Sequence, residues 1–308
     1  MNVTASPIVV TPSVLAASLQ QDLRSNQAQI ATSETQIATG RAVNLPSDNP
    51  AQAANILQLG AAVSRAQQYS ANAQDGVDRL SLANATVNSV MGVLQQIAST
   101  LEGLTGDQTT GNATATAGVL TSLKSARAQL IDLANTSYAG QAIFSGTGTP
   151  TRAYDTTGTY VGAGTPPTRT VAPGTTVSVS VTGPTVFGPT GPTGLLGKTG
   201  ILARVIKELA TGQPASISKA ATTGLSELQA AMSTVASQAG QLGADQQAIQ
   251  RFAEQATATV TALEQKLAAA QDVTMAQAIT NLQAQQTSYK AALYVTSQLN
   301  TESLVTYL

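Results

Sequence analysis

Two long heptad repeats of apolar residues constrain the fold more than any other feature of this 308-residue chain. Between Ile56 and Leu101, alternating steps of three and four residues reach fourteen positions, and twelve of them are apolar. Between Leu225 and Ala270, thirteen of fourteen such positions are apolar. This period is typical of helices that pack along one narrow face. Each repeat therefore predicts a helix of roughly 70 Å, at ~1.5 Å per residue, and the helices must pack side by side to bury their stripes.

A polar residue occupies a stripe position in each repeat. These residues are Asn84 in the first repeat and Gln246 in the second. A polar residue at such a position can fix the register of two helices at some cost in stability. The alternative is a polar side chain that is tolerated because it lies near the surface. The sequence alone leaves both interpretations open.

The ends of the long helices carry recognisable signals. Asn49 is expected to cap the first long helix, and Pro50 suits its first position because a proline lacks only an N–H that would be unpaired there. A shorter helix is expected at about 119–137, folding back on the first. The C-terminal stripe slips by one residue at 272–274, which predicts a joint before the stripe resumes at Met275.

The middle of the chain has a different composition. Residues 140–200 hold 13 of the 25 Gly and 7 of the 12 Pro. Within this window, strict alternation predicts a strand at 175–181, and 160–161 and 168–171 are weaker candidates. The predicted fold is mainly α, with long antiparallel coiled-coil-like helices from both termini and a small β-rich domain inserted in the middle. The expected division is terminal amphipathic helices at 1–45 and 275–308, a long-helix rod at 46–140 and 200–274, and the β-rich insertion at 141–199.

Both chain ends predict amphipathic helices with thin apolar stripes. The candidate contact residues are Leu15, Leu19, Leu23, Ile30 and Ile37 near the N-terminus, and Leu282, Tyr289, Leu293, Leu299, Leu304 and Leu308 near the C-terminus. Such stripes cannot be buried by one helix alone, so we expect the ends to pair with each other and with neighbouring copies. In a free monomer, amide exchange should be rapid before about Asn44 and beyond about Met275. Membrane-surface helices are the competing interpretation, but those favour Lys and Arg on the polar face.

Composition argues against most chemistry. The chain has no Cys and no His, so thiolate nucleophiles, disulfides and imidazole bases or ligands are excluded. Charged residues make up 10% of the chain and form no basic run, which argues against nucleic-acid binding. Neither a membrane span nor an ordinary secretory signal is expected. We therefore predict no enzyme activity, no cofactor and no metal site. Surfaces this poor in charge favour self-association.

Several motifs carry a family resemblance. Residues 39–51, TGRAVNLPSDNPA, resemble the N-terminal signature of bacterial flagellins and hook-associated proteins. Residues 272–278, DVTMAQA, and the ending SLVTYL resemble the C-terminus of the same superfamily. Within it, residues 46–50 and 143–147 and the Tyr-Leu ending look most like the hook–filament junction proteins. The resemblance covers roughly the first 150 and the last 110 residues.

The resemblance implies a structural subunit of the bacterial flagellum, located outside the cell after export through the flagellar type III apparatus with a chaperone and without a cleaved signal. The terminal helices would form an inner coiled-coil layer, and the β-rich insertion would face outwards. The subunit would form a helical or ring homo-oligomer between the first hook-associated protein and the flagellin filament. Two alternatives stay open. One is a short flagellin that polymerises into the filament itself, and the other is an enzyme or carbohydrate-binding module in the insertion.

The residues between the terminal helix and the first long helix form a corner motif: Arg41, Asn44, Asp48, Asn49 and Pro50. They either hold this bend and touch a neighbouring subunit, or form a capped helix–loop–helix corner without a partner. The family resemblance favours the role in assembly.

Overall fold

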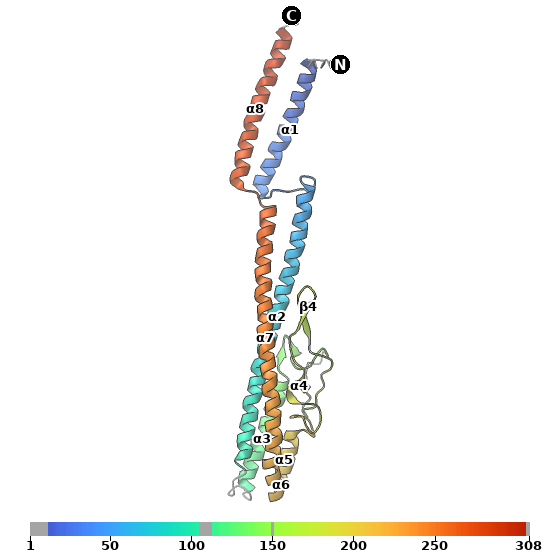
Figure 1. Ribbon diagram of the computed structural model, residues 1–308, viewed down its shortest axis with the longest axis vertical. Helices are drawn as coiled ribbons and strands as arrows, with labels where there is room; N and C mark the ends of the chain where they lie inside the picture. The colour runs from blue at the N-terminus through green and yellow to red at the C-terminus, as the bar shows by residue number, and fades with distance from the viewer. Residues whose placement is uncertain (1–11, 105–112, 149–150, 306–308) are drawn as a thin grey trace, which may run out of the picture. The chain divides into compact units, whose positions relative to one another are not determined.

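The computed structural model describes residues 12–104, 113–148 and 151–305. The expectations about an N-terminal signal and about Leu308 lie outside these residues. Five long helices dominate the fold (Figure 1), and their bounds are α1 Pro12–Thr39, α2 Pro50–Glu102, α3 Ala113–Ala134, α7 Leu225–Gln271 and α8 Met275–Val305. The prediction of a mainly α fold with long helices from both termini and a small β insert is confirmed.

The chain divides into two compact units. The first unit comprises residues 1–64 and 261–308, and the second comprises residues 65–260. The expected division into terminal, rod and insertion segments stays a prediction about how the chain is layered in an assembly. The predicted joint at 272–274 is confirmed, because α7 ends at Gln271 and α8 begins at Met275.

The core of the second unit is built on the two heptad stripes. Side chains seven residues apart on α2 and on α7 are fully buried: Ala73, Leu80, Val87, Leu94 and Leu101 on α2, and Leu228, Val235, Leu242 and Ile249 on α7. The helices run antiparallel, since the Ser70 hydroxyl lies 3.4 Å from that of Thr257 while Asn84 bonds to Gln246. The predicted side-by-side packing of the two long helices is therefore confirmed in this unit.

The predicted helix at 119–137 is placed too late in the chain. It begins at Ala113 as α3 and ends at Ala134, because Ser137–Tyr138 (β1) and Gln141–Ala142 (β2) form a hairpin. Ala139 and Gly140, the two turn residues, have φ of 50° and 79°. Such a turn matches the twist of paired strands. The chain therefore leaves the helix three residues earlier than its apolar pattern indicates.

The insertion contains less strand than predicted. Strands β3 (Thr168–Ala172) and β4 (Thr175–Ser178) pair antiparallel, so β4 ends before the alternating pattern does. Val179 is fully buried outside the sheet, and Tyr160 forms only an isolated bridge with Tyr154. The remaining regular structure is helical: α4 Gly183–Phe187, α5 Ile201–Ala210, α6 Pro214–Lys219 and the π-turn η1 Ala220–Gly224.

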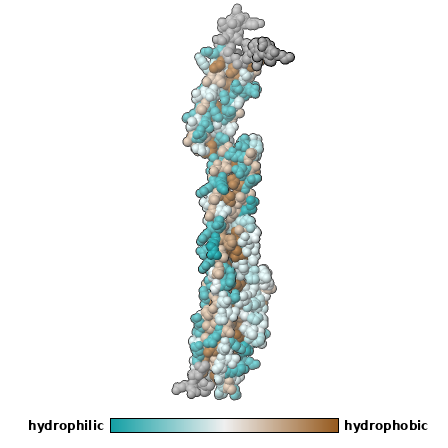
Figure 2. All heavy atoms as spheres, viewed as in Figure 1, coloured by the Kyte–Doolittle hydropathy of each residue, from teal (hydrophilic) through white to brown (hydrophobic). Residues whose placement is uncertain are grey.

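Aromatic contacts form much of the insertion's core. The rings of Phe144 and Phe187 meet edge to face at 5.6 Å, and Tyr154 lies 5.4 Å from Phe187 and 5.3 Å from Tyr160. Edge contacts of this kind add stability beyond the area they bury. The surface is different: the insertion is pale in Figure 2, since Gly, Thr and Ser have intermediate hydropathy. A few aromatic residues thus hold together a segment that is otherwise poor in large apolar side chains.

Candidate assembly surface

The first unit contains a seam between the two terminal helices, which lie side by side in Figure 1. The least exposed residues of each helix recur at steps of three and four: Leu19, Leu23, Asn26, Ile30, Ser33 and Ile37 on α1, and Ala278, Leu282, Gln285, Tyr289, Ala292 and Thr296 on α8. This period is that of a coiled-coil seam. The structure thus brings most of the described candidate contact residues together along one line.

Hydrogen bonds between side chains cross this seam. Ser33 is 6% exposed, and its hydroxyl donates to Oε1 of Gln285 at 2.9 Å. The Gln27 amide donates to the Tyr289 hydroxyl at 2.8 Å. Gln27, Ser33 and Gln285 were not predicted as contact residues, because the prediction followed apolar side chains only. The signal was present, since Ser33 lies three residues after Ile30 and four before Ile37, as a seam position should.

An uncovered apolar stripe lies on α8 beside the seam. Leu293 and Ile279, two heptads apart, are 43% and 44% exposed, and Met275 is 45% exposed one turn before Ile279. Tyr294 and Val295 are exposed as well. Gln286 occupies the stripe position between Ile279 and Leu293, so the exposed apolar side chains form two groups along α8. Exposed apolar groups of this kind mark surfaces that bind another molecule. Leu293 is therefore the one described candidate that the seam leaves exposed, while Leu282 and Tyr289 are half-buried in it.

Three further candidates cannot be placed in this surface. Leu15 lies in α1, and Leu299 and Leu304 lie in α8, but their side chains fall outside what the structure describes.

In the corner, backbone hydrogen bonds join the segment after α1 to the segment after α7. The N–H of Ala42 donates to the Gln271 carbonyl at 2.8 Å, and the N–H of Val273 donates to the Gly40 carbonyl at 2.9 Å. Arg41 and Asp272 thereby form an isolated antiparallel bridge. Gly40 has a φ of 71°, a conformation that glycine adopts without strain and that commonly ends a helix. The segment before α2 and the segment after α7 are thus joined directly.

Side chains of the corner motif reinforce this bridge. The Gln271 amide, with its oxygen toward Arg41, accepts from Nε at 2.8 Å and from Nη2 at 3.2 Å. One carboxylate oxygen of Asp48 accepts from the N–H groups of Asn44 and Leu45 at 3.2 and 2.8 Å. All five motif residues thus lie in one corner, and these polar contacts all stay within the first unit.

The start of α2 follows the capping pattern expected from the sequence. Oδ1 of Asn49 accepts from the N–H of Gln52 at 3.1 Å, and Pro50 is the first residue of the helix. The Gln52 side chain in turn donates to the Ala270 carbonyl at 2.7 Å. Gln52 was not singled out from the sequence, although its place three residues after a capping Asn was a usable signal.

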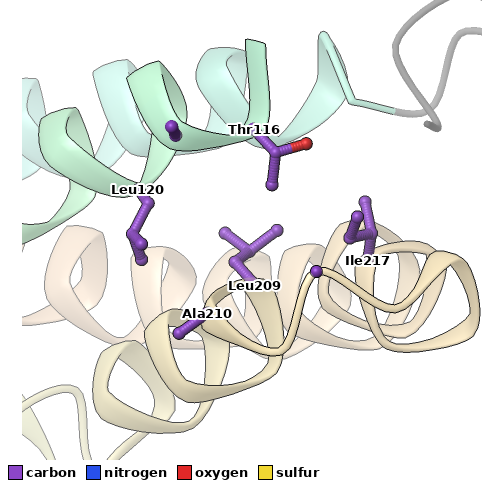
Figure 3. Close-up of a pocket in the computed structure, with 7 residues that line it drawn as sticks. Thr116, Leu120, Leu209, Ala210 and Ile217 are labelled. Carbon is purple, nitrogen blue, oxygen red and sulfur yellow. The ribbon is translucent and has the colours of Figure 1, made fainter. Parts of the chain in front are cut away.

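The hollow shown in Figure 3 has no described side chain that could act as an acid or base or bind an ion. It measures about 230 Å³ and lies between α3 and the α5–α6 turn in the second unit. Thr116 and Leu120 line one side, and Leu209, Ala210 and Ile217 line the other. None of its described lining residues is charged. Such a hollow can accept an apolar group but cannot transfer a proton or hold an ion.

The described residues form neither a metal cluster nor a membrane span. Within residues 12–104, 113–148 and 151–305, no three Asp or Glu side chains gather where they could hold a metal ion. No helix among these residues is both long and apolar enough to cross a bilayer.

Comparison with known proteins identifies the relatives of these helices. The profile of the bacterial flagellin N-terminal helical region matches residues 10–149, and that of the C-terminal helical region matches residues 225–308. Comparison with curated protein sequences gave no match.

Solved structures share the fold. A candidate flagellar hook-associated protein from Vibrio parahaemolyticus is similar, with a TM-score of 0.61 at 21% identity, over 72% of this chain and 99% of that one. FlgL of Bacillus cereus is similar, with a TM-score of 0.54 at 15% identity, over 68% of this chain and 99% of that one.

Proposed function

We propose that this chain, which belongs to the bacterial flagellin family, is a structural subunit of the junction between the flagellar hook and the filament. The helical terminal regions that the family profiles cover are the ones that form the α1–α8 seam. The terminal helices form the inner layer by packing against neighbouring axial subunits, and the insertion faces outwards. The subunit has no enzymatic activity, reaches the cell exterior through the type III export apparatus with a chaperone, and retains its N-terminus.

The uncovered stripe of α8 carries this proposal. Ile279 and Leu293 expose more than two fifths of their surface, although they lie directly beside a seam that already holds α1. Burying a fully exposed side chain of this size contributes about 1.5–3 kcal/mol, so covering the exposed two fifths of Ile279 and Leu293 contributes roughly 1 kcal/mol each. A helix from a neighbouring subunit can cover these exposed side chains while α1 and α8 stay paired. Assembly therefore adds to the seam and does not replace it.

Placement at the junction rests on two weaker observations. Residues 46–50 and 143–147 resemble the junction proteins within the family. One solved structure of similar fold, that from Vibrio parahaemolyticus, carries a hook-associated name, which belongs to that protein. The second candidate is a short flagellin, because the same terminal helices would serve a filament subunit. In the junction role the first hook-associated protein lies on one side and flagellin on the other.

Two experiments separate these roles. Deleting the gene should leave hooks without filaments and flagellin free in the medium if the chain is the junction subunit. Intact hooks that carry filaments would overturn the junction role. Purified protein added to flagellin seeds should bind their ends without elongating them, whereas extended self-polymerisation would establish the flagellin alternative.

The stripe itself can be tested with matched substitutions. Ile279→Gln and Leu293→Gln should abolish binding to the neighbouring axial subunits while leaving the unfolding of the monomer unchanged. Leu57→Gln is the control, since Leu57 is 72% exposed on α2 and lies outside the stripe. Equal effects of Leu57→Gln and Leu293→Gln in a sedimentation assay would contradict the proposal.

A further inference from the structure

Four basic side chains gather on the second unit of a chain that is otherwise sparsely charged. The chain has 15 Lys and Arg among 308 residues. Lys124, Arg127 and Arg152 line one hollow of about 400 Å³. Lys124 and Arg127 also line a second hollow of about 360 Å³, together with Lys198. Lys124 and Arg127 therefore line both hollows, and their two positive charges form the wall that the hollows share.

Arg127 is held in a fixed position on this wall. It projects from α3, and its Nη2 donates to the carbonyl groups of Thr157 and Gly197 at 2.5 and 3.3 Å. Its Nε is buried and has no hydrogen-bond partner among the described residues. A buried donor without a partner costs about 1–3 kcal/mol. Part of this guanidinium thus stays unsatisfied although its orientation is set.

The four cations lack matching counter-ions. The ion pairs found among the described residues join Arg169, Arg204 and Lys219 to acids elsewhere. Asp132 is the single acid among the described residues that line the two hollows. Like-signed charges left together without partners destabilise the folded chain unless an anion neutralises them.

Asp155 supplies one negative charge near Lys198, but its own turn holds the carboxylate in place. Its Oδ1 accepts from the N–H groups of Thr157 and Thr159, both at 2.8 Å, and from the Thr157 hydroxyl. The Thr157 side chain and the Thr159 N–H lower the pKa of this carboxyl most, with a smaller contribution from Lys198. Asp155 is therefore ionised and oriented by its own turn. It attracts Lys198 without forming one of the ion pairs found among the described residues, so the Lys198 ammonium keeps donors for a ligand.

We infer that these adjoining hollows bind a ligand with at least two carboxylate or phosphate groups, one on each side of Arg127. Arg152 and Lys198 lie in opposite hollows, and Lys124 reaches both. Ala128 and Ile131 give the larger hollow an apolar wall, and Ser137 and Thr156 add hydroxyl groups. This lining suits anionic groups on a less polar frame. The inference does not depend on the flagellar role.

Calorimetric titration of the full chain tests this site. Tripolyphosphate and trigalacturonate are the two probes, and galactotriose is the uncharged control. Binding should weaken steeply with added salt. Lys124→Gln and Arg152→Gln should each lower affinity about tenfold, and both side chains are exposed, so the fold should persist. Lys266→Gln, an exposed position in the first unit, should change nothing.

Each outcome is decisive. Binding of one probe alone supports the site and identifies phosphate or carboxylate as its ligand chemistry. Binding that galactotriose reproduces would overturn the inference. Binding that is reduced equally by Lys124→Gln and Lys266→Gln would also overturn it, because the chain would then attract anions by its overall charge. A failure to bind either probe at low salt would do the same.

Discussion

The Asn84 side chain donates a hydrogen bond to Oε1 of Gln246 at 3.3 Å, across the seam between α2 and α7. The two amide residues that interrupt the heptad stripes thus meet each other. A slip of one heptad in either helix would leave both amides facing apolar side chains. The pair accordingly fixes the register of the two long helices.

Replacing the two amides by leucine, singly and together, should measure how much their pairing contributes to the free energy of unfolding. Asn84→Leu or Gln246→Leu alone leaves a half-buried amide without its partner across the seam and should destabilise the second unit by about 1–3 kcal/mol. The double substitution should recover most of that loss, so urea unfolding of the four proteins should give a clear coupling energy. Gln250→Leu, exposed on α7, serves as control. Additive single effects would contradict the pairing.

Two glycines in α2 should respond in opposite directions to alanine. At Gly76 an added Cβ would meet Cδ1 of Ile249 and would lie 2.8 Å from Cγ1 of Val179, whereas nothing lies within 4 Å at Gly92. Gly76→Ala should therefore lower the free energy of unfolding by about 1–3 kcal/mol. Gly92→Ala should raise it by about 0.5–1 kcal/mol. Denaturant midpoints of the two variants compare them directly, and a gain in both would refute the close approach.

Two neighbouring tyrosines of the insertion should respond in opposite directions to replacement by phenylalanine. The Tyr154 hydroxyl is buried without a partner among the described residues, while the Tyr160 hydroxyl donates to the Phe144 carbonyl at 3.2 Å. Tyr154→Phe should therefore stabilise the protein, and Tyr160→Phe should destabilise it by about 0.5–1.5 kcal/mol. Thermal unfolding at neutral pH measures both, and equal losses would argue against the unpaired hydroxyl.

The same pair predicts an alkaline loss of stability. Burial raises the pKa of Tyr154, and also that of Tyr160. Above pH ~10 an unfolded tyrosine releases its proton while the folded one retains it. The unfolded state then binds fewer protons, so the free energy of unfolding falls as pH rises. Urea unfolding measured at a series of pH values should show this fall from about pH 10 upwards, and Tyr154→Phe should make it shallower.

Removing the Arg41 guanidinium should weaken the backbone bridge of the corner. In Arg41→Met the contacts to Gln271 disappear, so exchange of the Ala42 and Val273 amides should accelerate about fivefold, which corresponds to ~1 kcal/mol. Hydrogen exchange resolved at these residues provides the measurement. Arg24→Met, on the exposed face of α1, should leave both rates unchanged. Unchanged exchange in Arg41→Met would show that the backbone bridge stands alone.

Long-range periodicity made the helices predictable, and local chemistry made the corner partly so. The stripes through Leu80 and Leu242 and the slip at 272–274 located α2, α7 and α8, because burial of a narrow face leaves a repeat that a sequence can show. Asn49 and Pro50 marked a helix start for the same kind of reason, since capping acts over a few residues.

The contacts between segments that are distant in the sequence could not be predicted from it. The bond between Ser33 and Gln285 depends on which amide faces which hydroxyl, and the sequence contains many of both. The short strand β4 depends on how the loops around it pack, so alternation overestimated its length. The gathering of Lys124, Arg152 and Lys198 likewise results from the fold of the insertion onto α3 and has no counterpart in their spacing.

The composition of the α1–α8 seam sets how reversible the pairing of these helices is. Where Ser33 meets Gln285 and Gln27 meets Tyr289, separation exposes groups that water solvates as well as their partners do. Most other seam positions are apolar, with Leu23, Ile30 and Ile37 on α1 and Leu282 on α8, and these side chains resist separation. The pair therefore stays closed while the exposed side chains of α8 engage a neighbouring subunit. The polar contacts select how α1 aligns with α8 and the apolar contacts hold the pair together, so the two chain ends enter an assembly as one preformed unit.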